Sequence, residues 1–367
     1  MRYRYVKQAN GKTVKTATVY TADEHRIKPE SVDKDAVYII SRLQAQGHES
    51  YIVGGAVRDL MAGKLPKDFD IVTDANPSKI KKLFRNSRII GRRFRLVHVY
   101  FGPKMFEVST FRSLKDGPTS NTYGTIEEDV LRRDFTVNAF FYDPLKQLVL
   151  DYVGGMKDVR AKRIRPIIPL DLIFKDDPVR MVRAAKYGVS TGYALPFFLR
   201  WKIKKEAPLL KTVSPSRLTE EINKIINSSY AAGIVRKLDS LGLYGYLQPN
   251  AVELFKIKPL FKEQYLKSLD AHNGGSERLP GEALSSLIRD YLEVSLDWEN
   301  AGPESFKDAL LAARSFVLPI NPPRVEIELA VRLIFREHGI TVRKYRLLSE
   351  GEGKRRRRAP ARNKTPE

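Results

Sequence analysis

The sequence predicts an α+β protein in which a small mixed α/β head precedes an all-helical body. Between residues 51 and 142, short apolar segments with the two-residue period of strands alternate with helical segments. From residue 177 onward the strand pattern fades and apolar residues recur at helical spacing. The chain has 367 residues and is 42% hydrophobic, which is enough for more than one domain.

The predicted elements of the head begin after a polar segment. Residues 1–30 are polar and basic with little periodicity, so we expect a mobile arm or a loosely docked extension. Residues 35–46 predict an amphipathic helix that packs beneath the first strand. The remaining expected elements are strands at 51–53, 68–72, 88–91, 96–101, 105–111 and 139–142, and helices at 55–62, 77–84 and 126–138.

The predicted body is a bundle of helices. Helical periodicity is visible at 217–227, 231–238, 281–293, 306–314 and 324–337. In the last of these, the apolar residues at helical spacing are Ile327, Ala330, Val331, Ile334 and Phe335. Residues 354–358 form a run of one lysine and four arginines, and this tail is too charged to fold alone.

The charge balance indicates a polyanionic partner. The net charge is +22, and the last seventeen residues contribute about +5 of it, so the folded part is itself basic. The alternative is a charge excess that serves only solubility. The chain has no cysteine, which excludes disulfides, zinc-thiolate sites and iron–sulfur clusters. No stretch approaches the roughly 20 apolar residues of a membrane span, and the first five residues lack the apolar core of a secretory signal, so we expect a cytoplasmic protein. We also expect a monomer.

A glycine pair followed by two closely spaced carboxylates is the most informative motif. Gly54 and Gly55 follow a predicted strand, and Asp68 and Asp70 lie in the next one. Side chains at i and i+2 of a strand share a face, so the two carboxylates would lie side by side and suit Mg²⁺. The glycines permit close backbone approach to a triphosphate, within reach of Arg58. Taken alone, the two aspartates could be an ordinary solvated pair and the two glycines an ordinary turn. Their occurrence together in this order is what indicates phosphoryl-group chemistry.

The motif resembles the first motif of the class II nucleotidyltransferases, the family of CCA-adding tRNA enzymes and bacterial poly(A) polymerases. The resemblance covers roughly the first two-thirds of the chain and weakens after about residue 225. It continues through Glu-Val-Ser-Thr-Phe-Arg at 107–112, Arg-Arg-Asp-Phe-Thr-Val-Asn-Ala at 132–139, Asp-Tyr-Val-Gly-Gly-Met-Lys-Asp at 151–158 and Asp-Asp-Pro-Val-Arg-Met-Val-Arg-Ala at 176–184.

The resemblance implies a third carboxylate, Glu107, that binds two Mg²⁺ ions together with Asp68 and Asp70. Strand alternation lets Glu107 face away from Phe106 and Val108, although an ordinary exposed glutamate would fit the same pattern. One metal would lower the pKa of an RNA 3′-hydroxyl, and the other would neutralise the phosphates of ATP. The five histidines are scattered without metal-ligand spacing.

The resemblance also implies a nucleotide pocket built from two helices. We expect Asp134 and Asn138 on one helical face at i, i+4, meeting the ribose and triphosphate beside Arg133; a structural cap is the alternative for Asp134. Further residues that the resemblance assigns to nucleotide binding are Asp177, Arg180, Arg183 and Arg217.

In the family, the pair equivalent to Asp177 and Arg180 reads the Watson–Crick edge of the base. The i, i+3 spacing allows a salt bridge between them, and an ion pair without function is the alternative. Asp176 stands where the family usually has Glu, and Lys186 with Tyr187 where Arg-Phe is usual, which puts the nucleotide preference in doubt.

The segment 89–101 discriminates between members of the family. Its Gly-Arg-Arg-Phe-Arg-Leu-Val-His-Val pattern resembles bacterial poly(A) polymerases, and its Arg92, Arg93 and Arg95 could hold the RNA backbone. We therefore favour AMP transfer from ATP to RNA 3′ ends over CCA addition. A catalytically silent RNA-binding protein on the same scaffold is a further alternative.

The domain boundaries that follow are 1–30 for the basic extension and 31–150 for the catalytic head. We expect a helical nucleotide-recognition neck at 151–225, a helical RNA-binding body at 226–345 and a disordered basic tail at 346–367.

Overall fold

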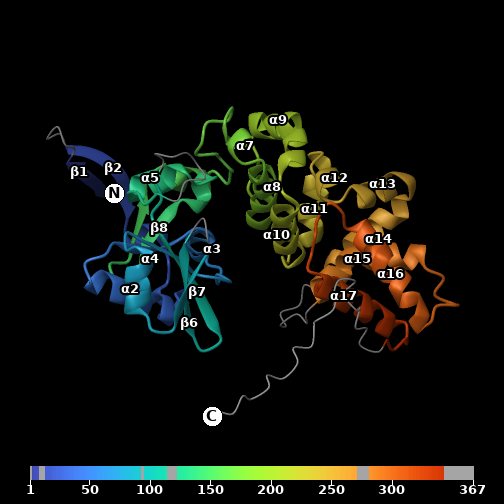
Figure 1. Ribbon diagram of the computed structural model, residues 1–367. Coiled ribbons are helices and arrows are strands. Elements are labelled where there is room, and N and C mark those ends of the chain that lie inside the picture. The colour runs from blue at the N-terminus through green and yellow to red at the C-terminus, as the bar shows by residue number, and fades with distance from the viewer. Residues whose placement is uncertain (1, 8–12, 92–94, 114–121, 271–280, 343–367) are drawn as a thin grey trace, which may run out of the picture.

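The computed structural model describes residues 2–7, 13–91, 95–113, 122–270 and 281–342. The molecule is elongated (Figure 1), with the sheet-containing head at one end and the helical part extending from it, so that α13 and α16 lie farthest from the head and α17 turns back. The expected mixed head and helical body are confirmed. The expected contacts Arg92 and Arg93 and the basic tail lie outside the described residues.

The head is built on a nine-stranded sheet of order β1-β2-β9-β8-β3-β4-β7-β6-β5. Neighbouring strands are antiparallel except β4 and β7, which are parallel. The strands are β1 (Arg2–Lys7), β2 (Thr13–Tyr20), β3 (Ser50–Val53), β4 (Asp70–Thr73), β5 (Ser87–Ile90), β6 (Leu96–Phe101), β7 (Lys104–Thr110), β8 (Phe140–Asp143) and β9 (Leu148–Asp151).

The two faces of the sheet carry different helices. On one face, strand residues such as Ile71 and Val108 pack against α2 (Lys34–Ala45), α3 (Gly55–Met61) and α4 (Pro77–Leu83). On the other face, Val72 and Phe141 pack against α5 (Ile126–Leu131). Because side chains alternate along a strand, a residue next to Ile71 or Val108 in sequence lies on the α5 face.

The expectation of a loosely docked segment at 1–30 is wrong for the residues described there. β2 pairs with β9, and α1 (Ala22–His25) and the 3₁₀ turn η1 (Pro29–Ser31) lead directly into α2. Ala17, Val19 and Tyr20 are buried, so this polar-looking segment carries an apolar face. β9, which was not among the expected strands, supplies the ladder that holds it.

The expected helix at 126–138 is interrupted. α5 ends at Leu131, and after a turn the chain forms the 3₁₀ turn η2 (Thr136–Asn138). Phe135 and Val137 are fully buried here, and they pack with the helical part of the chain instead of the head.

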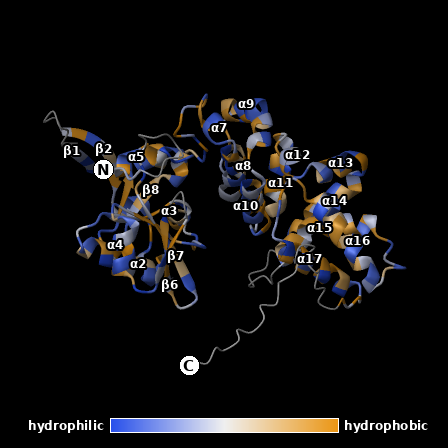
Figure 2. Cartoon of the chain, in the orientation of Figure 1, coloured by the Kyte–Doolittle hydropathy of each residue, from blue (hydrophilic) through white to orange (hydrophobic). Residues whose placement is uncertain are grey.

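The helical part forms one apolar core that runs from Phe135 to Phe335. The five expected body helices are confirmed with small changes at their ends, and Figure 2 shows apolar and polar residues interspersed along them. The helices are α6 (Gly155–Arg160), α7 (Ile173–Asp176), α8 (Val179–Thr191), α9 (Phe197–Glu206), η3 (Ala207–Thr212), α10 (Pro215–Ile226), α11 (Ala231–Ser240), α12 (Tyr244–Leu247), α13 (Pro249–Ile257), α14 (Pro259–Asp270), α15 (Glu282–Ser295), η4 (Pro303–Ser305), α16 (Phe306–Phe316) and α17 (Arg324–Glu337).

The division between neck and body at residue 225 stays a prediction, since residues on both sides of it share that core. Within the described ranges, no helix combines the length and apolar character needed to cross a bilayer.

Candidate active site

The glycine pair joins β3 to α3 at the edge of the α5 face. Gly54 has φ +73°, which an L side chain adopts only under strain, and the position a Cβ would occupy is 3.9 Å from Oδ2 of Asp70. Arg58 on α3 folds back over this turn, because its Nη1 donates to Oδ1 of Asn138 at 2.7 Å and its Nε and Nη2 donate to Oδ1 of Asp59. The turn therefore places backbone that no side chain covers, together with the oriented guanidinium of Arg58, beside the carboxylate of Asp70.

The predicted carboxylates interact, and they come from two segments of the chain: Asp68 and Asp70 at or just before the start of β4, and Glu107 on β7. Asp70 begins β4 and Asp68 precedes the strand, so the two do not share a strand as expected. Ile71 pairs with Val108 in the parallel ladder, which places Asp70 beside Glu107 on the α5 face. Burial, Glu107 and Asp68 together raise the pKa of Asp70 to about 6, although solvent still reaches its carboxylate.

These carboxylates fit a divalent cation. Burial and the two neighbouring carboxylates disfavour the charged form of Asp70, and a hard cation bound between the carboxylates would stabilise that form. Burial also raises the pKa of Glu107, against the opposing effect of Arg112 and Lys224. Within the described part of the chain, no three His, Cys, Asp or Glu side chains converge on a ready-made metal cage. Mg²⁺ does not need one, because it takes one or two carboxylates and completes its shell with water and phosphate.

Two cations border the carboxylates from opposite sides. Arg133, predicted near the nucleotide, lies with Cζ 4.8 Å from the ring centroid of Phe141, and its Nη2 is 2.9 Å from Oδ2 of Asp129. Its charge, like that of Lys224, acts to lower the pKa of Asp70. Lys224 lies on α10, so residues of the head and of the helical neck both contribute to the candidate site.

The expected helical face of Asp134 and Asn138 is wrong, because the helix ends before either residue. Asn138 turns toward Arg58, whereas Asp134 accepts the backbone N–H of Phe135 at 2.8 Å and lies 4.0 Å from Nη1 of Arg183. Both remain near the candidate site, but each contacts a different element. Burial raises the pKa of the Asp134 carboxyl.

A buried ion cluster connects α8 and α10. Glu221 accepts from Nε of Arg183 at 3.0 Å and from Nζ of Lys186 at 2.8 Å, and Nζ of Lys224 is 3.9 Å away. The Glu221 side chain is 2% exposed. Burial acts to raise its pKa, but the surrounding cations outweigh burial and hold the pKa below its usual value. Arg183 is thereby fixed in direction, and its own pKa is raised by Glu221 and Asp134 against the effect of burial.

The predicted salt bridge between Asp177 and Arg180 is replaced by another pairing. Asp177 lies between α7 and α8, and Nη2 of Arg217 contacts both of its carboxylate oxygens at 2.9 and 2.8 Å. The buried Arg180 instead donates to the carbonyl oxygens of Ile173 and Arg132 at 3.2 and 3.3 Å. All three predicted residues lie close to one another, but Arg217 is the partner that orients Asp177.

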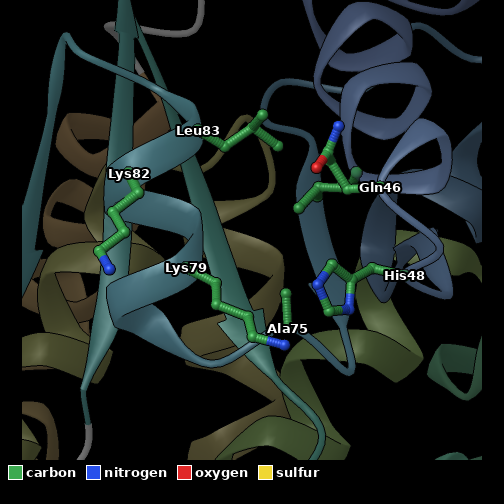
Figure 3. A pocket seen from close by; sticks show the side chains of 7 residues that line it. Gln46, His48, Ala75, Lys79, Lys82 and Leu83 are labelled. Atoms are coloured by element: carbon green, nitrogen blue, oxygen red, sulfur yellow. The ribbon is translucent and has the colours of Figure 1, made fainter.

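The head also contains a pocket that lies away from the carboxylate site. It has a volume of about 410 Å³ and lies between α2 and α4, where His48 and Lys79 face each other (Figure 3). His48 precedes β3 and Ala75 follows β4, whereas Gly54 and Asp70 lie at the opposite ends of these antiparallel strands. The pocket is therefore not part of the carboxylate site.

Four site residues were not predicted as such from the sequence: Lys186, Tyr187, Glu221 and Lys224. The ring centroid of Tyr187 is 5.7 Å from Cζ of Arg58, which links α8 to α3. Glu221 and Lys224 stand at i, i+3 on an amphipathic helix, a pattern that most often marks a solvated face. The available sequence signal was that Glu221 shares a helical face with Leu218 and Ile225, three residues before it and four after it, and a buried acid needs partners.

The strand–glycine–helix turn, the carboxylate cluster and the helical neck that bears fixed cations together form the nucleotidyltransferase fold. Residues 50–165 match the family described as the poly A polymerase head domain, and residues 199–254 match the one described as "Probable RNA and SrmB- binding site of polymerase A". The chain belongs to the nucleotidyltransferase family that contains bacterial poly(A) polymerases and CCA-adding enzymes.

Curated relatives come from both branches of the family. Poly(A) polymerase I of Escherichia coli O157:H7 is 38% identical over 279 residues, covering 70% of this chain and 60% of that protein. The CCA-adding enzyme of Geobacillus stearothermophilus is 35% identical over 220 residues, covering 58% of this chain and 54% of that protein. The chain thus spans less than two thirds of the length of these relatives.

Solved structures of CCA-adding enzymes share the fold. The Bacillus stearothermophilus enzyme in complex with CTP is 26% identical with a TM-score of 0.58, covering 84% of this chain and 83% of that one. The Thermotoga maritima enzyme complexed with tRNA is 21% identical with a TM-score of 0.52, covering 87% and 85%. The second likeness concerns the fold alone.

Proposed function

We propose that this protein is a poly(A) polymerase that transfers AMP from ATP to RNA 3′ ends without a template and releases pyrophosphate. The observation that carries the proposal is the electrostatic coupling of Asp70 with Asp68 and Glu107 beside the Gly54 turn. An inactive RNA-binding scaffold would have no reason to keep three carboxylates whose mutual repulsion costs free energy. We place the activity in the cytoplasm, where ATP and RNA are both present.

Asp68, Asp70 and Glu107 would hold two Mg²⁺ ions. When bound, the ions lower the pKa of the RNA 3′-hydroxyl and neutralise the triphosphate and the departing pyrophosphate. The RNA 3′-hydroxyl would give up its proton and attack the α-phosphorus in line, while the bond from that phosphorus to the pyrophosphate oxygen breaks, so that no covalent enzyme intermediate is needed.

The remaining residues position the nucleotide. The backbone at Gly54 and Gly55 leaves room for the triphosphate, and Arg58, held by Asn138 and Asp59, donates to it. Arg133 lies beside the same carboxylates, and Arg183, held by Glu221, faces Asp134 near the ribose. These cations are fixed before substrate arrives, which lowers the cost of ordering them in the transition state.

Asp177 and Arg180 would read the base. Arg217 and the backbone N–H of Val179 hold the Asp177 carboxylate, which can accept from an exocyclic amino group while Arg180 donates to a ring nitrogen. Adenine and cytosine both present an amino donor there, whereas guanine and uracil present a carbonyl oxygen. The pair therefore favours ATP and CTP over GTP and UTP, but does not by itself separate ATP from CTP.

CCA addition is the second candidate, because CCA-adding enzymes are among both the curated relatives and the structural ones. The higher identity to poly(A) polymerase I, 38% against 35%, favours polyadenylation. The arginine-rich pattern at 89–101 supports the same choice, and Arg95 is exposed beside β6, where it can contact RNA.

The test is incorporation of each labelled nucleotide, with Mg²⁺, onto a generic RNA ending in adenosine and onto a tRNA lacking its 3′ end. Long ATP-dependent ladders on the generic RNA are expected. Addition of CTP and then ATP that stops on the tRNA would replace this proposal with CCA addition. The control pair is Glu107→Gln, which should lose all incorporation, and Glu304→Gln, which alters an exposed acid at the start of η4 and should not.

A further inference from the structure

The helix α9 presents three aromatic rings to solvent. Phe197, Phe198 and Trp201 are 66, 70 and 52% exposed, whereas Leu199 and Ile203 of the same helix are buried in the core. The helix is thus anchored by one side, and its rings turn outward from the other. Three large exposed rings on ten residues are costly in water and indicate a surface that binds a partner.

Basic side chains lie among these rings. Phe197, Arg200, Trp201 and Lys204 follow the i, i+3, i+4, i+7 spacing of one helical face, and with Lys237 of α11 they line a pocket of about 400 Å³. We call these five residues the aromatic-basic face.

The charge of this helix is almost entirely positive on its exposed side. Nζ of Lys205 lies 5.0 Å from the ring centroid of Trp201. The single acid of α9, Glu206, is paired with Lys202 at 2.9 Å. Exposed rings therefore lie beside Arg200, Lys204 and Lys237, which form no ion pair with any residue that the structure describes.

We propose that the aromatic-basic face binds unpaired RNA upstream of the growing 3′ end, with bases stacked on Phe197 and Trp201 and phosphates held by Arg200, Lys204 and Lys237. Stacking on aromatic rings beside a basic groove is how proteins bind single-stranded nucleic acid without reading its sequence. The inference rests on RNA being the substrate, as in the proposed function. Four of the five residues of this face fall within 199–254, the segment that matches the RNA-binding description, and the inference adds the unpaired form of the RNA and the side chains that hold it.

Single-stranded RNA fits this face better than a duplex. In a duplex the base faces are stacked on one another, so the rings of α9 would have nothing to stack on. The cations favour a polyanion, whereas an apolar protein surface would leave Arg200, Lys204 and Lys237 without partners. The face thus suits a growing unpaired tail more than the paired acceptor end of a tRNA.

Tryptophan fluorescence tests the contact directly. The chain has two tryptophans, and Trp298 is stacked on His338 in the body. In a Trp298→Phe background, Trp201 is the remaining reporter. Adding an oligo(A) of about 15 nucleotides without ATP should quench it, and the quenching should weaken as salt rises. A duplex RNA of equal length should quench far less.

A matched pair of double variants measures the effect on affinity. Phe197→Ala with Trp201→Ala should weaken oligo(A) binding, measured by fluorescence anisotropy, by at least about tenfold. The control, Ile257→Ala with Leu260→Ala, removes two side chains that are 73 and 81% exposed on α13 and α14 and should leave affinity unchanged. Thermal melting of both variants checks that each is folded.

Transfer to a primer too short to reach α9 separates this inference from the proposed function. The Phe197, Trp201 variant should keep wild-type AMP transfer to that primer and lose efficiency on long RNA. Unchanged oligo(A) affinity, absent quenching of Trp201 or equal quenching by the duplex would each overturn the inference, and would leave the face to a protein partner. Loss of AMP transfer by the wild-type chain, with RNA binding at α9 intact, would instead refute only the proposed activity.

Discussion

Replacing Glu221 with glutamine should destabilise the protein and weaken nucleotide binding together. The carboxylate is buried against Arg183 and Lys186 at 3.0 and 2.8 Å, so Glu221→Gln leaves two cations at the head–neck boundary without their counter-ion. Removing one partner of a buried pair costs about 3 to 5 kcal/mol. We expect a loss near the lower limit, because Arg183 retains Asp134 at 4.0 Å.

The assay combines chemical denaturation with kinetics, and the neighbouring residue supplies the control. Glu220 is exposed on the same helix, so Glu220→Gln removes the same charge without touching the cluster and should change stability by less than about 0.5 kcal/mol. In Glu221→Gln, Arg183 is no longer held, and the KM for ATP should rise by roughly tenfold or more. Adding Lys186→Met to Glu221→Gln should recover part of the lost stability.

The pH dependence provides a second measure of the same interaction. The pKa of Glu221 is held below its usual value, so its stabilising effect is present above about pH 4.5 and is lost as pH falls through the folded-state pKa. The difference between wild type and Glu221→Gln should therefore shrink in acid. Equal stability and equal KM for the two glutamine variants at neutral pH would refute the assigned role of Glu221.

Three further results are expected. Asp70→Asn should lower AMP incorporation by at least about a hundredfold and leave the circular dichroism spectrum unchanged; retained activity would remove the metal-site assignment. Gly54→Ala should cost about 1 to 3 kcal/mol in denaturant unfolding because φ is +73° there, whereas Gly55→Ala, whose Cβ would lie in ordinary contact 3.5 Å from Arg58, should cost less. Burial lowers the pKa of His25, whose Nδ1 accepts the N–H of Ile27, so thermal stability should fall as pH drops below about 6.5. His25→Gln should weaken the fall in melting temperature with decreasing pH, and an unchanged pH dependence in this variant would contradict the role given to His25.

The local sequence pattern was sufficient to predict the mixed head, the helical body and the strand face on which Glu107 lies. Strand alternation predicted that Glu107 faces away from Phe106 and Val108, and the ladder between β4 and β7 does place it beside Asp70. Helical periodicity likewise predicted the buried stripe of α17, including Ile327 and Phe335. Such patterns are local, because the repeat of a strand or a helix determines which side chains share a face.

Pairing between distant segments was decided only by the tertiary structure. Asp177 and Arg180 have the spacing of a salt bridge, yet Asp177 is held by Arg217, forty residues away. The polar-looking segment Thr13–Tyr20 forms a strand because its backbone pairs with β9 and its apolar side chains near the C-terminal end are buried. The sequence by itself predicted which residues are candidates for the chemistry. Which of them meet depended on how the head packs against the neck, since a charged side chain selects its partner by distance and burial after the chain has folded.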